Sequence, residues 1–175
     1  MKRAIQKPNP TEYPEYAEMY MKLIPDDGFI LEHLENNYRE IVNLILSLSD
    51  KKLNFRYKKN KWSIKEILVH LVDDERIYAY RALRFARNDK TELPGFEEKE
   101  FVKFSDTETR SLSNILEEYD FVMKSTIALF EGFSEEALLR TGTANENKNS
   151  VRSLVYHIAG HELHHLNVIR TFYLV

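Results

Sequence analysis

Apolar residues recur at intervals of three and four positions in four long segments of the chain. The segments are Phe29–Leu48, a stretch that begins after Trp62 and ends near Arg87, a stretch that follows the motif FSDTE, and one that begins near Asn149 and runs almost to the end. This spacing places the apolar side chains on one face of a helix. Only five glycines and five prolines interrupt the chain. The pattern therefore predicts an all-α fold, a four-helix bundle.

Capping motifs predict where three of these helices begin. Ser63 and Glu66 have the spacing of a capping box, in which each side chain accepts a hydrogen bond from the other residue's backbone N–H. Ser105 and Glu108 repeat that spacing, so we expect the third helix to begin beside them. The pair Asn-Ser at 149–150 supplies a cap for the last helix.

The segments between the helices complete the expected domain. Residues 89–104 (DKTELPGFEEKEFVKF) form a long connection that contains Pro94 and Gly95, and this connection is long enough to cross the end of the bundle. Residues 133–139 (FSEEALL) predict a short extra helix. Residues 1–28 are rich in proline and tyrosine and are expected to lie over the bundle as an N-terminal arm. The whole chain is expected to form a single domain.

Composition narrows the classes of function. The 175 residues carry a net charge of −3, with no basic stripe for nucleic acid and no polybasic cluster for a membrane surface. The absence of cysteine excludes disulfides, thiolate nucleophiles and cysteine-ligated metals. The first residues lack the apolar core of a signal peptide, and no run of apolar residues is long enough to span a membrane. We expect a soluble cytoplasmic protein.

Histidines gather on the last helix. At about 100° per residue, His161 and His165 lie in the middle of its apolar stripe, one turn apart, whereas His157 and His164 lie on one flank. Apolar neighbours cannot satisfy the nitrogen atoms of two buried imidazoles, but one metal ion can bind both. We expect His157 and His164 to be solvated or hydrogen-bonded and not to bind the ion.

A third ligand is expected from another helix. His70 lies near the edge of the second helix's apolar stripe, on the same side as Asp74, which could orient His70 or another ligand. His33 lies early in the first helix, beside its stripe, and is expected at the surface. The predicted metal ligands are therefore His70, His161 and His165.

The same segment also matches a protease motif. HELHH has the form H-E-x-x-H, in which Glu162 would be the general base. Proteases of that class take a third ligand from farther along the chain, but the ten residues that follow contain no His, Asp or Glu. A zinc protease is therefore not expected.

Three stretches resemble a known family. They are KWSIKEILVHLVDDERIYAYRALRFARNDKTELPGF, SVRSL and AGHELHHLNVIR. In this order they resemble the DinB-like superfamily of bacterial metal-binding four-helix bundles, and the resemblance extends from about residue 12 to the end. The family's ligand positions, one in the second helix and two in the fourth, fall on His70, His161 and His165. The role of Glu162 stays open, because it is not part of that pattern.

The resemblance also implies a range of activities. Members are often described as metal-dependent hydrolases, and some resemble transferases or isomerases that use a low-molecular-weight thiol. Three histidines with an open position suit a catalytic zinc, nickel or iron ion. We expect an enzyme that acts on a small molecule, as a hydrolase or a thiol transferase, and a homodimer, because members commonly pair. The alternative is a non-catalytic, metal-stabilised binding or stress-response module.

Overall fold

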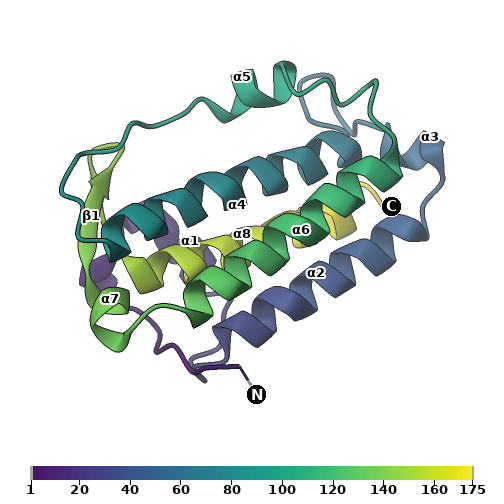
Figure 1. Ribbon diagram of the computed structural model, residues 1–175. Helices are drawn as coiled ribbons and strands as arrows, with labels where there is room; N and C mark the ends of the chain where they lie inside the picture. The colour runs from purple at the N-terminus through teal and green to yellow at the C-terminus, as the bar shows by residue number, and fades with distance from the viewer. Residues whose placement is uncertain (1, 175) are drawn as a thin grey trace.

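Four long helices form the body of the protein in a computed structural model that describes residues 2–174. They are α2 (Ile30–Leu46), α4 (Ile64–Ala86), α6 (Leu112–Glu131) and α8 (Val151–Phe172) (Figure 1). Both α4 and α2 pack against both α6 and α8, which gives the order α4–α8–α2–α6 around the bundle. The predicted four-helix bundle, with its crossover and its arm, is confirmed.

The connection between α4 and α6 determines the topology. The sequence suggested a connection across one end of the bundle, but it carries the chain back along the length of the bundle, so that α6 runs in the same direction as α4 (Figure 1). A short helix that the sequence did not predict, α5 (Glu98–Lys103), interrupts this crossover and packs against α4. As a result, a polar segment lies beside the helix that carries His70.

Two of the three predicted helix starts are confirmed. Ser63 Oγ accepts a hydrogen bond from the backbone N–H of Glu66 (3.2 Å), and Glu66 accepts one from the N–H of Ser63 (2.6 Å). At the start of α8, Ser150 Oγ accepts a hydrogen bond from the N–H of Ser153 (3.1 Å), so Ser150 is the cap. These bonds satisfy N–H groups that have no partner within the helix.

The predicted start of the third helix is wrong. Helix α6 begins at Leu112, where Ser111 Oγ accepts a hydrogen bond from the N–H of Asn114 (3.2 Å). Ser105 instead donates its hydroxyl hydrogen to the carbonyl of Val102 (2.7 Å) at the end of α5. The next residue, Asp106, has φ 52°, and this left-handed conformation cannot continue a right-handed helix.

Smaller elements close the two ends of the bundle. They are α3 (Asp50–Leu53), the predicted short helix α7 (Glu135–Leu139), and an unpredicted hairpin of β1 (Thr141–Ala144) and β2 (Asn147–Ser150). The strands are too short and too polar to show an alternating pattern. The hairpin also holds the start of the crossover, because the N–H of Leu93 donates to the carbonyl of Thr143 (3.0 Å).

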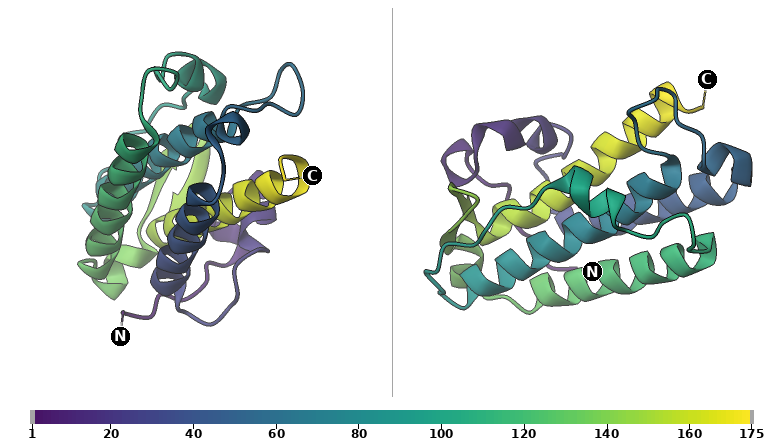
Figure 2. Two further views of the ribbon diagram at one scale, coloured as in Figure 1. Left: turned by 90° about the vertical axis from the view of Figure 1, so that its right-hand side faces the viewer. Right: turned by 90° about the horizontal axis from the view of Figure 1, so that it is seen from above.

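The N-terminal arm lies along α8. It contains the 3₁₀ turns η1 (Pro10–Glu12) and η2 (Glu15–Ala17) and the short helix α1 (Glu18–Met21) (Figure 2, right). The Tyr156 hydroxyl of α8 donates to the carbonyl of Ile5 (2.8 Å). At Gly160, an added Cβ would lie 2.4 Å from the backbone oxygen of Tyr20, so only glycine allows this close approach.

A buried polar layer divides the apolar core into two clusters. One cluster includes Leu34, Tyr78 and Ile158, and the other includes Ile41, Leu71 and Leu166. Between them, three of the bundle helices bury polar side chains at one level: Asn37, Asp74, Glu75, His161 and Glu162. No helix among residues 2–174 is both long enough and apolar enough to cross a membrane.

The contact between the arm and α8 gives the first prediction. Replacing a helical glycine by alanine usually stabilises a helix. We expect Gly160→Ala to lower the free energy of unfolding by about 1–3 kcal/mol, because the new methyl group overlaps the backbone of Tyr20. Thermal unfolding and limited proteolysis of the arm would measure this effect.

Gly132→Ala is the matched control, since its Cβ would meet nothing closer than 3.5 Å. A Gly160→Ala variant as stable as the parent protein would show that the arm does not pack this closely in solution.

Candidate metal centre

Helices α4 and α8 bring three imidazole rings together. His70 comes from α4, and His161 and His165 come from successive turns of α8. One ring nitrogen of each lies within 4.8 Å of the others. His161 Nε2 is 3.1 Å from His70 Nε2 and 3.0 Å from His165 Nε2. The structure thus gathers the three residues that the sequence selected, whereas His33 pairs with Asp27 elsewhere (2.9 Å).

Asp74 lies beside the central ring and acts on it through its charge. Its Oδ2 atom lies 3.2 Å from Nδ1 of His161. The carboxylate favours a proton on Nδ1 of His161, which leaves the lone pair of Nε2 directed toward the other two histidines. Asp74, on the same helix as His70, therefore orients the ring on the neighbouring helix α8.

The three rings cannot satisfy one another by hydrogen bonding. The single lone pair of His161 Nε2 accepts one N–H at most, yet two ring nitrogens face it. In addition, Nδ1 of His165 is buried and has no hydrogen-bond partner among the described residues. Nitrogens that share one tetrahedral ion at about 2.0–2.1 Å lie about 3.3 Å apart. The two separations measured from His161 Nε2, 3.1 and 3.0 Å, are close to this value and fit a shared cation.

The charge states of these groups also suit a cation. Burial lowers the pKa of His70 to about 4, and burial together with the neighbouring imidazoles lowers the pKa of His165 well below its usual range. Both rings are therefore neutral near pH 7, as metal binding requires.

Asp74 contributes a buried negative charge. Burial alone would raise its pKa, but the adjacent His161 and His157 lower the pKa to about 2. Only 3% of Asp74 is exposed, and no Lys or Arg among residues 2–174 forms an ion pair with it. A buried carboxylate needs a compensating positive charge, which a bound cation would supply.

The flanking histidines differ from each other. His157 is buried, and its ring stacks on Tyr78 at 3.9 Å between centroids, so of the two expected environments, solvated or hydrogen-bonded, the solvated one is wrong. The reason is that the arm covers this flank, with the Tyr20 ring 4.8 Å from that of His157. His164 is partly exposed and lies outside the three-histidine group.

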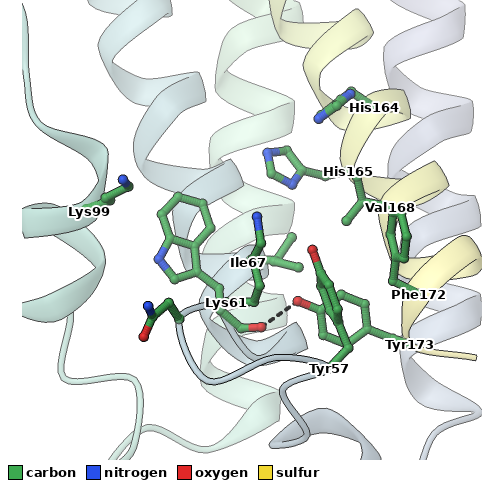
Figure 3. A pocket seen from close by; sticks show the side chains of 11 residues that line it. Tyr57, Lys61, Ile67, Lys99, His164, His165, Val168, Phe172 and Tyr173 are labelled. Carbon is green, nitrogen blue, oxygen red and sulfur yellow. Dashed lines mark hydrogen bonds between the residues drawn. The ribbon is translucent and has the colours of Figure 1, made fainter.

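Two cavities are lined by histidines of this region. The larger, about 650 Å³, is lined by His165 and His164 and by residues of α4, α5 and the end of α8 (Figure 3). The smaller, about 180 Å³, is lined by His161, Asp74 and His157 together with polar groups of the arm and the crossover. Among residues 2–174, no fourth His, Asp or Glu joins the group, and one of its members, His165, lines the larger cavity.

Glu162 faces away from this group. Its carboxylate accepts a hydrogen bond from the Tyr119 hydroxyl of α6, and it lines neither cavity. Burial raises the pKa of Glu162 well above its usual range, and burial raises the pKa of the nearby Glu75 to about 8. A protonated carboxyl that faces α6 is not placed to act as the base of a zinc protease.

Two aromatic residues of the site were missed by sequence reasoning. The Trp62 ring lies 4.7 Å from the His70 ring and is nearly parallel to the His165 ring. The edge of Tyr20 meets His161 at 5.4 Å between centroids. Trp62 directly precedes the cap of α4 and could have been placed near His70. Tyr20 lies in the arm, where no periodic pattern indicates which way a side chain faces.

Two known proteins are similar to this chain, one in sequence and one in fold. The Oceanobacillus iheyensis protein named "Putative metal-dependent hydrolase OB0413" is 28% identical over 142 residues, which cover 80% of this chain and 79% of that protein. The structure of YfiT from Bacillus subtilis, described as "a probable metal-dependent hydrolase with an unusual four-helix bundle topology", matches with a TM-score of 0.64. That match covers 94% of this chain and 91% of YfiT at 17% sequence identity, and so concerns the fold.

The part of the chain that matches a known family includes all three histidines. The family model of the DinB superfamily matches residues 33–169, which extend from the first turns of α2 to near the end of α8. Because this match spans most of the chain and agrees with the resemblance found in the sequence, the protein belongs to the DinB superfamily.

Proposed function

We propose that His70, His161 and His165 bind one divalent metal ion and that the protein is a metal-dependent enzyme acting on a small molecule. The observation that carries this proposal is the convergence of three ring nitrogens beside a cavity of about 650 Å³, without a fourth protein ligand among residues 2–174. Structural zinc sites are closed by four protein ligands, whereas catalytic sites keep one position open. The name of the Oceanobacillus relative supports hydrolysis as the reaction class.

The residues of the chain have distinct tasks in this proposal. A bound ion would lower the pKa of a water or a thiol, or polarise a carbonyl group. Asp74 holds the His161 ring in the ligating tautomer. Trp62 and Tyr20 cover the histidines from two sides and limit the access of water. The larger cavity leaves space for a substrate next to His165.

Thiol transfer is the second candidate reaction. The chain has no cysteine, so any thiol would come from a low-molecular-weight cosubstrate. A purely structural metal site is the remaining alternative, and the absence of a fourth ligand among the described residues speaks against it. Three imidazoles suit zinc, nickel or iron, and elemental analysis of protein purified without a histidine tag would identify the ion.

Replacement of single histidines tests the ligand set. We expect His161→Ala to abolish tight metal binding, because it removes the central nitrogen of the group. His164→Ala is the neighbouring control and should bind metal like the parent protein. Calorimetric titration of metal-free protein would measure both affinities. Equal losses from the two substitutions would show that the group is not the binding site.

Replacement of the two buried acids tests the role of Asp74. Asp74→Asn should lower metal affinity about tenfold to a hundredfold, because the amide orients His161 less strongly and lacks the balancing charge. Glu162→Gln should leave the affinity unchanged, since Glu162 faces Tyr119. The same titration compares them, and a larger loss in Glu162→Gln would contradict this assignment.

An activity screen tests whether the protein is an enzyme. Metal-loaded protein is incubated with panels of esters, amides and electrophiles, with and without a small thiol. We expect turnover that disappears when all three histidines are replaced by alanine, with thiol dependence distinguishing transfer from hydrolysis. Equal rates in both proteins, or no turnover across the panels, would favour the binding-module alternative.

A further inference from the structure

The larger cavity has flat, apolar walls. Its aromatic and aliphatic lining consists of Tyr57, Trp62, Ile67, Val168, Phe172 and Tyr173. The rings of Tyr57 and Phe172 are stacked, with centroids 5.1 Å apart and planes inclined by 17°. The Phe172 side chain is 46% exposed even though it continues the apolar stripe of α8. An apolar surface of this kind, left uncovered beside a metal centre, is suited to a flat organic group.

The acidic and basic side chains that line the cavity are all basic. Lys61 and Lys99 both line it, and no Asp or Glu does. Within residues 2–174 neither lysine forms an ion pair, whereas the nearby Glu66 pairs with Arg56. Figure 3 shows the Lys61 side chain rising into the pocket toward His165, while Lys99 lies on the other side from Phe172.

These two lysines come from different segments of the chain. Lys61 directly precedes Trp62 at the start of α4, and Lys99 belongs to α5 in the crossover. Two ammonium groups that line one apolar cavity, without an ion-pair partner among the described residues, form an electrostatic complement to an anionic group. Two charges over one pocket are too few and too local for a nucleic-acid backbone, but they suit a small anion.

We propose that this cavity binds a small organic carboxylate with a flat apolar body. The apolar body lies against Tyr57, Trp62 and Phe172, and the carboxylate meets Lys61 and Lys99. A volume of about 650 Å³ is in the range of pockets for molecules of this size. That the carboxylate is the substrate rests on the proposed function, whereas its binding depends only on the cavity.

The single tryptophan makes binding measurable without turnover. Trp62 is the only tryptophan of the chain and lines this cavity, so its fluorescence reports directly on an occupant. The probes are 4-phenylbutanoate and its neutral amide, 4-phenylbutanamide, titrated into metal-free and metal-loaded protein. We expect the carboxylate to change the fluorescence saturably and to bind at least about fivefold more tightly than the amide, with a difference that shrinks as salt is added.

Substitution of the two lysines tests whether they cause the preference for the carboxylate over the amide. The double variant Lys61→Gln/Lys99→Gln should weaken carboxylate binding about fivefold or more and leave amide binding nearly unchanged. The control is Lys90→Gln/Lys148→Gln, which removes the same net charge at exposed positions outside the cavity. The control variant should bind both probes like the parent protein.

The outcomes separate this proposal from the proposed function. Carboxylate binding in metal-free protein that is lost in the Lys61/Lys99 variant supports the proposal even if no substrate is turned over. Equal affinity for the carboxylate and the amide, or equal losses in the two double variants, would overturn it. No saturable fluorescence change with either probe would also overturn it, while metal binding by the histidines would stand independently.

Discussion

Three imidazole nitrogens that face one another within a helical bundle impose the constraint on which the rest of this structure depends. Groups that all present lone pairs to one point repel one another, and in a buried site water cannot separate them. The neighbouring carboxylate of Asp74 adds a negative charge at the same level. This layer is therefore a place where positive charge is favoured, and the apolar clusters on either side supply the packing that holds it together.

The fold meets this constraint by giving each helix face a separate task. On α8, His161 faces α4 and the cavities, whereas the next residue, Glu162, faces α6 and bonds Tyr119. On α4, Asp74 likewise lies beside His161, whereas the next residue, Glu75, faces α6. The bundle thus contains two adjacent polar environments with opposite electrostatic character. One keeps His70 and His165 neutral near an ionised carboxylate, and the other keeps carboxyl groups protonated through burial.

Segments outside the four helices turn this layer into an accessible site. The arm covers one flank of α8, where Gly160 allows the backbone of Tyr20 to approach closely. The crossover, anchored to the hairpin through Leu93, places Lys99 over the larger cavity. A bundle without these segments would expose His157 and would lack one wall of each cavity. The proposed metal ligands therefore lie on the long helices, whereas the arm and the crossover contribute to the proposed selectivity for the substrate.

The sequence alone determined the features that depend on local periodicity. Steps of three and four residues gave the four helices, the capping box at Ser63 was recognisable from its spacing, and the facing of His161 and His165 followed from the helical repeat. The same reasoning placed His70 near the edge of the apolar stripe of its helix, and the structure brings these three histidines together. Each of these conclusions concerns residues within a few turns of one another on a regular helix.

Tertiary structure decided what periodicity cannot encode. Helix α6 begins at Leu112, after the cap Ser111, because Asp106 is left-handed and Ser105 bonds back to the carbonyl of Val102. Asp74 orients His161, and His157 is buried, because the packing of α4 and of the arm against α8 brings together residues far apart in the chain. The positions of Trp62 and Lys99 around one cavity likewise depend on the path of irregular segments, where side-chain direction follows long-range packing and no repeat of the sequence.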